Sequence, residues 1–245
     1  LRKMREIYNK IVKAGLYQAS SIKVAELSKI LENTQRFINI ALINDISTLS
    51  NKMKIKTTDV IDAASTKWNF VKYYPGLVGG HCIAVDPLYL AHKQKKIKVS
   101  SALIEAADYL NKKKHLEIID ELKKKYKNLA KKKILILGLA FKENCPDLRN
   151  SGVLNLIKSL NIKKIKPFIH DPYVNKEELD KEIKLNYHFV KKLKKNNYDF
   201  IILAVGHNFY KKMGFNKIKN VSSKKISYFF DLKNIFHNNK NDYQL

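Results

Sequence analysis

The feature that most constrains the fold of this chain is a series of four short apolar runs in its second half. They read KKILILGLAF, KPFIHDPY, YDFIILAVGH and ISYFFDLKN. Apolar runs of this length, bounded by lysines or turn residues, are typical of strands that are buried on both faces. A helical pattern that starts near Val153 separates the first two runs. Strands that alternate with helices predict a parallel α/β sheet.

The first half of the chain has helical spacing instead. From Ile22, apolar residues recur every three or four positions over a long stretch that ends near Asn51, and Ser20 or Ser21 can cap its start. Further helices are expected at residues 1–15, 57–64, 87–94 and 101–127. We therefore predict an all-helical domain at residues 1–130, followed by a Rossmann-like parallel α/β domain at residues 131–245.

The formal net charge of +26 raises the possibility of nucleic-acid binding, because lysines can displace counterions from phosphates. However, only four of the 48 basic residues are arginines, on which base readout relies, and the lysines are spread along the whole chain. Runs such as 112–114 and 131–133 are expected to be solvated faces. We therefore favour compositional drift over nucleic-acid binding, although this charge still attracts anionic ligands.

Cysteine usage and apolar run lengths indicate the setting of the protein. Two cysteines are too few for a disulfide framework, so we expect a reducing, cytoplasmic environment. The sequence has no apolar run long enough to cross a bilayer, and its first residues lack the pattern of a signal peptide. We expect neither a membrane attachment nor a metal site. The chain begins with Leu1, so it is expected to start inside a longer protein.

The stretch PGLVGGHCIAVDP, residues 75–87, combines two glycines with a cysteine. Gly79 and Gly80 are expected to let the backbone approach a ligand closely, because no side chain projects from them. The thiol of Cys82 on such a loop, with Asp86 four residues further on, suits covalent catalysis. The alternative is a small buried cysteine that only packs.

The long helix carries a second group of candidate residues. Lys29 and Asn33 are four positions apart, so both side chains lie on one helix face. A cation and an amide placed together can stabilise the oxyanion that forms when a thiolate attacks a carbonyl. The alternative is a surface lysine beside a surface amide, and the spacing alone does not decide between the two.

Several segments, in the same order along the chain, resemble the UDP-glucose/GDP-mannose dehydrogenase family. They are SSIKVAELSKILENTQRFINIALIND, TKWNF, PGLVGGHCIAVDPLYL and GLAFKENCPDLRNS. Within the family the similarity is greatest to the UDP-N-acetylhexosamine 6-dehydrogenases of bacterial surface-polysaccharide synthesis. The resemblance implies oxidation of the sugar C6 alcohol to a carboxylate with two NAD molecules in succession. It also implies a homodimer formed through the long central helix and a UDP-binding second domain.

The resemblance also implies roles for individual residues. Cys82 matches the nucleophile, which forms a thiohemiacetal with the C6 aldehyde and then a thioester that water hydrolyses. Lys29 matches the lysine that stabilises the oxyanions, Asn33 its amide partner, and Asp86 the aspartate that activates water or handles protons. The implied substrate contacts are Lys29, Asn33, Lys67, Tyr74, Gly76, Gly79, Phe141, Lys142 and Lys233, and the implied NAD contact is Arg149. The alternatives are a core position for Phe141 and a local ion pair between Arg149 and Asp147.

The chain also departs from the family pattern. No G-x-G-x-x-G phosphate-binding loop can be written from its eight glycines, so the NAD-binding domain of the family is expected to be missing. Asp108 and Tyr109 stand where relatives usually carry arginines, and Asp45 replaces a commoner glutamate. The chain is therefore expected to be part of a UDP-N-acetylhexosamine 6-dehydrogenase, with little or no activity alone. The alternative is a non-catalytic remnant that binds nucleotide sugars and dimerises.

Overall fold

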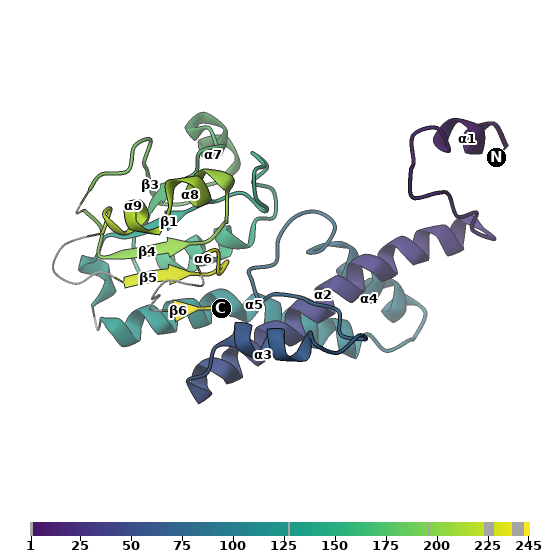
Figure 1. Cartoon of the computed structure of the whole chain (residues 1–245), viewed down its shortest axis with the longest axis horizontal. Helices are drawn as coiled ribbons and strands as arrows, with labels where there is room; N and C mark the ends of the chain where they lie inside the picture. Colours follow the sequence, from purple (N-terminus) through teal and green to yellow (C-terminus); the bar gives the residue numbers. More distant parts are fainter. Residues whose placement is uncertain (1, 127, 196, 223–227, 237–242) are drawn as a thin grey trace.

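A computed structural model describes residues 2–126, 128–195, 197–222, 228–236 and 243–245 of the chain. Figure 1 shows a helical first half, in which the long helix α2 crosses α5, and a second half built on a twisted sheet. Among the described residues, no helix combines the length and the apolar character needed to cross a membrane.

Five helices make up the first half. They are α1 (Arg2–Tyr8), α2 (Ile22–Met53), α3 (Thr57–Ala64), α4 (Asp86–Lys96) and α5 (Ala102–Lys125). The long helix α2 begins after Ser21, whose side chain accepts a hydrogen bond from the Val24 N–H at 3.2 Å. The expected helix at 1–15 ends at Tyr8, and none of its residues is buried, so no packing supports a longer one. Helices α2, α4 and α5 share a small core of Phe37, Ala41, Ala91, Ile104 and Ala107.

The second half is a parallel sheet with the strand order β3-β2-β1-β4-β5-β6. The strands are β1 (Ile134–Leu137), β2 (Phe168–His170), β3 (His188–Phe189), β4 (Phe200–Leu203), β5 (Tyr228–Asp231) and β6 (Tyr243–Gln244). The helices of this half are α6 (Gly152–Ile162), α7 (Lys176–Glu182), α8 (Asn208–Met213) and α9 (Phe215–Lys219), and a 3₁₀ turn spans Leu129–Lys131. This order confirms the expected Rossmann-like fold.

Helix α5 belongs to both halves of the molecule. Its first part packs on α2, whereas Ile118, Ile119 and Leu122 near its end are fully buried in the core beneath the sheet. In that core these side chains meet Leu156 and Leu160 of α6. One continuous helix therefore links the helical core to the core of the sheet.

A buried polar seam runs between α2 and α5. The ammonium of Lys114 donates to the Asn44 carbonyl at 3.0 Å and to Thr48 Oγ1 at 3.1 Å, and it lies 2.9 Å from Glu117 Oε2. Lys114 is 1% exposed, so the expectation that residues 112–114 form a solvated face is wrong for this lysine. The reason is the position of Lys114 on the face of α5 that packs against α2.

Candidate functional site

The Cys82 turn, residues 81–86, is held against the long helix. The Asp86 N–H donates to the Cys82 carbonyl at 3.0 Å, which closes one turn directly before α4. The Asp86 carboxylate accepts a hydrogen bond from Asn33 Nδ2 at 2.6 Å. Asn33 is buried on α2, so it is not the surface amide of the alternative interpretation. The thiol of Cys82 is exposed and therefore available for reaction.

Lys29 lies one helical turn before Asn33, and its ammonium pairs with Glu32 Oε2 at 2.8 Å. The pKa of Lys29 is raised, chiefly by the hydrogen bond to Glu32, and Cys82 also contributes to the shift through its charge. Lys29 and the Cys82 turn therefore lie in one electrostatic neighbourhood. The structure brings Lys29, Asn33, Cys82 and Asp86 to one region beside α2, and the catalytic roles of these residues stay predictions.

Gly79 and Gly80 lie against the second half of the chain. A Cβ on Gly79 would lie 2.8 Å from the Asn150 carbonyl oxygen and 2.9 Å from the Gly152 nitrogen. Gly80 has a φ of +85°, and a Cβ there would lie 2.7 Å from the ring of Phe141. The space on the Cα side of both glycines is therefore filled by neighbouring protein, because the two halves meet at this point, and the ligand contact expected of Gly79 stays a prediction.

Sequence reasoning missed the residue that holds Gly76 in place. Asn44 accepts the Gly76 N–H at 2.9 Å and donates to the Gly76 carbonyl at 3.1 Å. The Asn44 side-chain amide also donates to Asn111 Oδ1 at 3.0 Å, which joins α2 to α5. Asn44 lies on the same buried helix face as Phe37, and a polar residue on that face was the signal available in the sequence.

Lys67 and Tyr74 lie on the open segment between α3 and the Cys82 turn, and both are exposed. Tyr74 stacks loosely under the ammonium of Lys72, which is 5.6 Å from the ring centroid. Neither residue lines the cleft in the second half described next, so their predicted contacts with a substrate are separate from that cleft.

The switch-point cleft, a hollow of about 20 Å³, lies at the carboxyl ends of β1, β4 and β5, where the strand order reverses. It is lined by Leu77, Ala140, Phe141, Lys142, Ser151, Gly152, Val153, Ala204, Val205, Leu232 and Lys233. Ligands of open parallel sheets bind at this position. The structure thus brings Phe141, Lys142 and Lys233, three of the predicted substrate contacts, to one cleft. The half-buried ring of Phe141 packs on Gly80, so it belongs partly to the contact between the halves.

Arg149, the predicted NAD contact, pairs with Asp147 at 2.7 Å in the segment between β1 and α6. The hydrogen bond from Arg149 is the main reason that the pKa of Asp147 falls to about 2. The local ion pair that formed the alternative interpretation is therefore present, and a role for Arg149 in cofactor binding stays a prediction.

The backbone after β1 does not form a dinucleotide site. The N–H groups of Leu139 and Ala140 donate to Asp171 Oδ2 at 2.7 and 3.1 Å. In dinucleotide-binding sheets, backbone N–H groups at this position hold the pyrophosphate. Here a carboxylate of the protein takes that position, and His207 Nε2 holds it from the other side at 3.1 Å. NAD therefore does not fit the described residues of this sheet.

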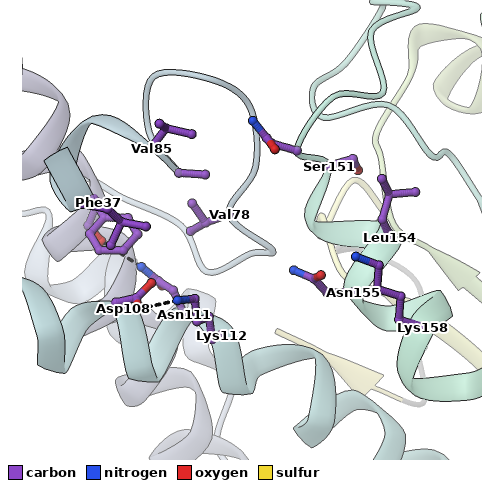
Figure 2. Close-up of a pocket in the computed structure, with 13 residues that line it drawn as sticks. Phe37, Val78, Val85, Asp108, Asn111, Lys112, Ser151, Leu154, Asn155 and Lys158 are labelled. Atoms are coloured by element: carbon purple, nitrogen blue, oxygen red, sulfur yellow. Dashed lines mark hydrogen bonds and ion pairs between the residues drawn. The ribbon is translucent and has the colours of Figure 1, made fainter. Parts of the chain in front are cut away.

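A cavity of about 380 Å³ lies between the two halves beside the glycine contact. Figure 2 shows apolar and polar side chains of the first half on one wall and side chains of α6 on the opposite wall. The labelled residues include Phe37, Val78 and Val85 on the first wall and Leu154, Asn155 and Lys158 on the second. Cys82 does not line this cavity. The cavity separates the two halves at this point. The direct contact between Gly79 and Gly152 beside it therefore helps to fix the position of one half relative to the other.

The resemblance seen in the sequence is confirmed by comparison with known proteins. The central domain of the UDP-glucose/GDP-mannose dehydrogenase family matches residues 23–113, and the UDP binding domain of the same family matches residues 135–238. The chain belongs to the UDP-glucose/GDP-mannose dehydrogenase family.

Relatives in the family are longer than this chain. The UDP-N-acetyl-D-glucosamine 6-dehydrogenase of Salmonella typhi is 42% identical over 98% of this chain and 57% of its own length. The enzyme of the same name from Pseudomonas aeruginosa gives the same three values. The chain therefore spans just over half the length of these dehydrogenases.

Solved structures of family members share the fold. The UDP-N-acetyl-mannosamine dehydrogenase Cap5O from Staphylococcus aureus gives a TM-score of 0.75 at 26% identity, covering 99% of this chain and 54% of Cap5O. A UDP-glucose dehydrogenase from Pyrobaculum islandicum gives a TM-score of 0.83 at 19% identity, covering 100% of this chain and 55% of that protein. The second comparison shows likeness of fold.

Proposed function

We propose that the chain is the nucleophile-bearing and UDP-sugar-binding part of an NAD-dependent UDP-N-acetylhexosamine 6-dehydrogenase of surface-polysaccharide synthesis. The observation that carries this proposal is the 2.6 Å hydrogen bond from Asn33 to Asp86, which holds the Cys82 turn beside Lys29. The names of the relatives and the three predicted contacts in the switch-point cleft support the same substrate class.

The residues of this chain account for the covalent part of such a reaction. The thiolate of Cys82 adds to the C6 aldehyde, forming a C–S bond and leaving the negative charge on the former carbonyl oxygen. Lys29 and the second N–H of the Asn33 amide stabilise that oxygen. In thioester hydrolysis, Asp86 takes a proton from the attacking water as the C–S bond breaks and the Cys82 thiolate leaves.

Oxidation of the alcohol to the aldehyde, and then of the thiohemiacetal to the thioester, each needs a hydride acceptor, and the segment after β1 forms no dinucleotide site. This finding favours the second candidate function, a module that binds nucleotide sugars without redox chemistry. Both candidates require UDP binding, but only the first requires the sugar C6 to lie at the Cys82 thiol.

Titration of the purified chain with UDP, followed by calorimetry, tests the shared part of the proposal. We expect Lys142→Ala and Lys233→Ala each to weaken UDP binding about tenfold, the loss of one charge-assisted contact. Lys158→Ala, which removes an exposed lysine outside the switch-point cleft, is the matched control and is expected to bind UDP as the wild type does. Absence of UDP binding by the wild-type chain would contradict both candidate functions.

Alkylation of Cys82 by iodoacetamide distinguishes the two candidates. UDP-N-acetylglucosamine or UDP-N-acetylgalactosamine is expected to slow the reaction, measured by peptide mass spectrometry, because the sugar covers the thiol. UDP alone is expected to leave the rate unchanged. If the nucleotide sugar binds but gives no protection, the nucleophile role of Cys82 is excluded and the binding module remains.

We further propose that two copies of the chain associate through α2. Leucines on one side of this helix are exposed, among them Leu31 at 62% and Leu42 at 54%, whereas the opposite face packs on α4 and α5. The exposed apolar stripe consists of Val24, Leu27, Leu31, Leu42, Leu49 and Met53. The described residues of the chain do not cover this stripe, so packing within one copy does not account for its apolar character.

The double variant Leu31→Asp/Leu42→Asp is expected to convert a dimer into a monomer, because it places two charges in the apolar contact. Light scattering coupled to gel filtration measures the mass. Ile162→Asp, at a residue of α6 that is 81% exposed, is the control and is expected to stay dimeric. A monomeric wild type, or a double variant that stays dimeric, would exclude α2 as the interface.

A further inference from the structure

Two oppositely charged side chains cross the end of β4 beside the switch-point cleft. Glu143 directly follows Phe141 and Lys142, and its Oε1 lies 3.1 Å from Lys233 Nζ. Both side chains pass over Gly206: a Cβ there would lie 3.6 Å from Lys233 Cβ and 3.8 Å from Glu143 Cγ. The two side chains are 34% and 38% exposed, so each is about two-thirds covered and the pair is held in place by its surroundings.

Glu143 is the acidic member of a group of basic residues. Partial burial acts to raise the pKa of Glu143, but the charges of Lys233 and Lys211 and local hydrogen bonds outweigh it, so the pKa is lowered. The carboxylate therefore stays ionised at neutral pH. It pairs with Lys233, which lines the cleft together with Lys142.

We propose that Glu143 determines the affinity of the cleft for the diphosphate of UDP by holding the ammonium of Lys233. This inference rests on the proposed function. A diphosphate that contacts Lys233 must share or displace the Glu143 carboxylate, and two anions at one ammonium repel each other. Removal of the Glu143 charge leaves Lys233 free for the phosphate oxygens, so the variant binds UDP more tightly.

Calorimetric titration with UDP tests the proposal with four proteins: the wild type, Glu143→Gln, Lys233→Ala and the double variant. Glu143→Gln keeps the shape of the side chain, and we expect it to bind UDP about fivefold more tightly, the upper range for a partly exposed ion pair. In the Lys233→Ala background the same change is expected to alter affinity less than twofold, because there is no ammonium to release. A gain in affinity cannot arise from loss of folding.

Glu105→Gln is the matched control, because Glu105 pairs with Lys95 at 2.6 Å in the helical half. It is expected to leave UDP affinity unchanged. Unchanged or weaker UDP binding by Glu143→Gln would overturn the proposal, and so would an equal gain in both backgrounds, which indicates general charge repulsion. If the wild type does not bind UDP, the proposed function itself is refuted. If the wild type binds UDP and Glu143→Gln binds it no better, only the role of Glu143 is refuted.

Discussion

Gly79→Ala is expected to lower the free energy of unfolding by about 2–3 kcal/mol, because overpacking against fixed backbone is costly. The new Cβ would lie 2.8 Å from the Asn150 carbonyl oxygen and 2.9 Å from the Gly152 nitrogen. Both are backbone atoms at the start of α6, so neither can rotate away as a side chain can. The clash can be relieved only if the segment before the Cys82 turn moves away from α6. Urea unfolding measures the loss.

The same segment contains a matched control for this substitution. An added Cβ on Gly76 meets nothing within 4 Å, although the residue is buried. Gly76→Ala is therefore expected to change stability by no more than about 0.5 kcal/mol. The reciprocal variant Gly152→Ala, whose Cβ would lie 2.6 Å from the Val78 carbonyl oxygen, is expected to resemble Gly79→Ala. Equal stability of the Gly76 and Gly79 variants would show that the halves do not meet closely here.

The fold was predicted from the sequence wherever burial imposes a regular pattern. Strands β1 and β4 are fully buried apolar runs, β2 and β5 are buried except at their first residues, and α2 has a long helical repeat, so each left a clear signal. Strands β3 and β6 are two residues long and have no repeat that sequence reasoning could detect. The first helix was predicted too long because its apolar residues contact no core.

The candidate site was predictable in its residue types but not in its contacts. The spacing of Lys29 and Asn33 placed both on one helix face, yet only the structure shows the bond from Asn33 to Asp86, 53 positions away. The contact between Gly79 and Gly152 and the use of Asp171 in place of a phosphate also join distant segments. Such pairings depend on how the halves pack, which no local pattern contains.

Lys114→Met is expected to lower the free energy of unfolding by about 2 kcal/mol. Methionine keeps most of the methylene chain, so the change removes mainly the ammonium. Two competing effects decide whether this substitution lowers or raises the free energy of unfolding. Burial of the charge is unfavourable, and it lowers the pKa of Lys114 despite the opposing charge of Glu117. Against this, loss of the ammonium removes its hydrogen bonds to buried oxygens of α2, including the Ser47 hydroxyl at 3.4 Å. We expect the second effect to dominate, because an unpaired buried polar group retains its full desolvation cost.

Lys113→Met is the matched control on the same helix. Lys113 is exposed and contacts Tyr109 of α5, so its loss is expected to cost less than about 0.5 kcal/mol.

The pH dependence gives a second test of Lys114. Because its pKa is lowered in the folded state from 10.5, the unfolded state binds more protons between the two values, and the wild type gains stability as pH rises through that range. The stability difference between the wild type and Lys114→Met is therefore expected to widen toward pH 10.5, measured by urea unfolding at several pH values. A difference that is constant with pH, or a Lys114 variant as stable as the Lys113 variant, would show that the ammonium is hydrated and does not help to hold α2 against α5.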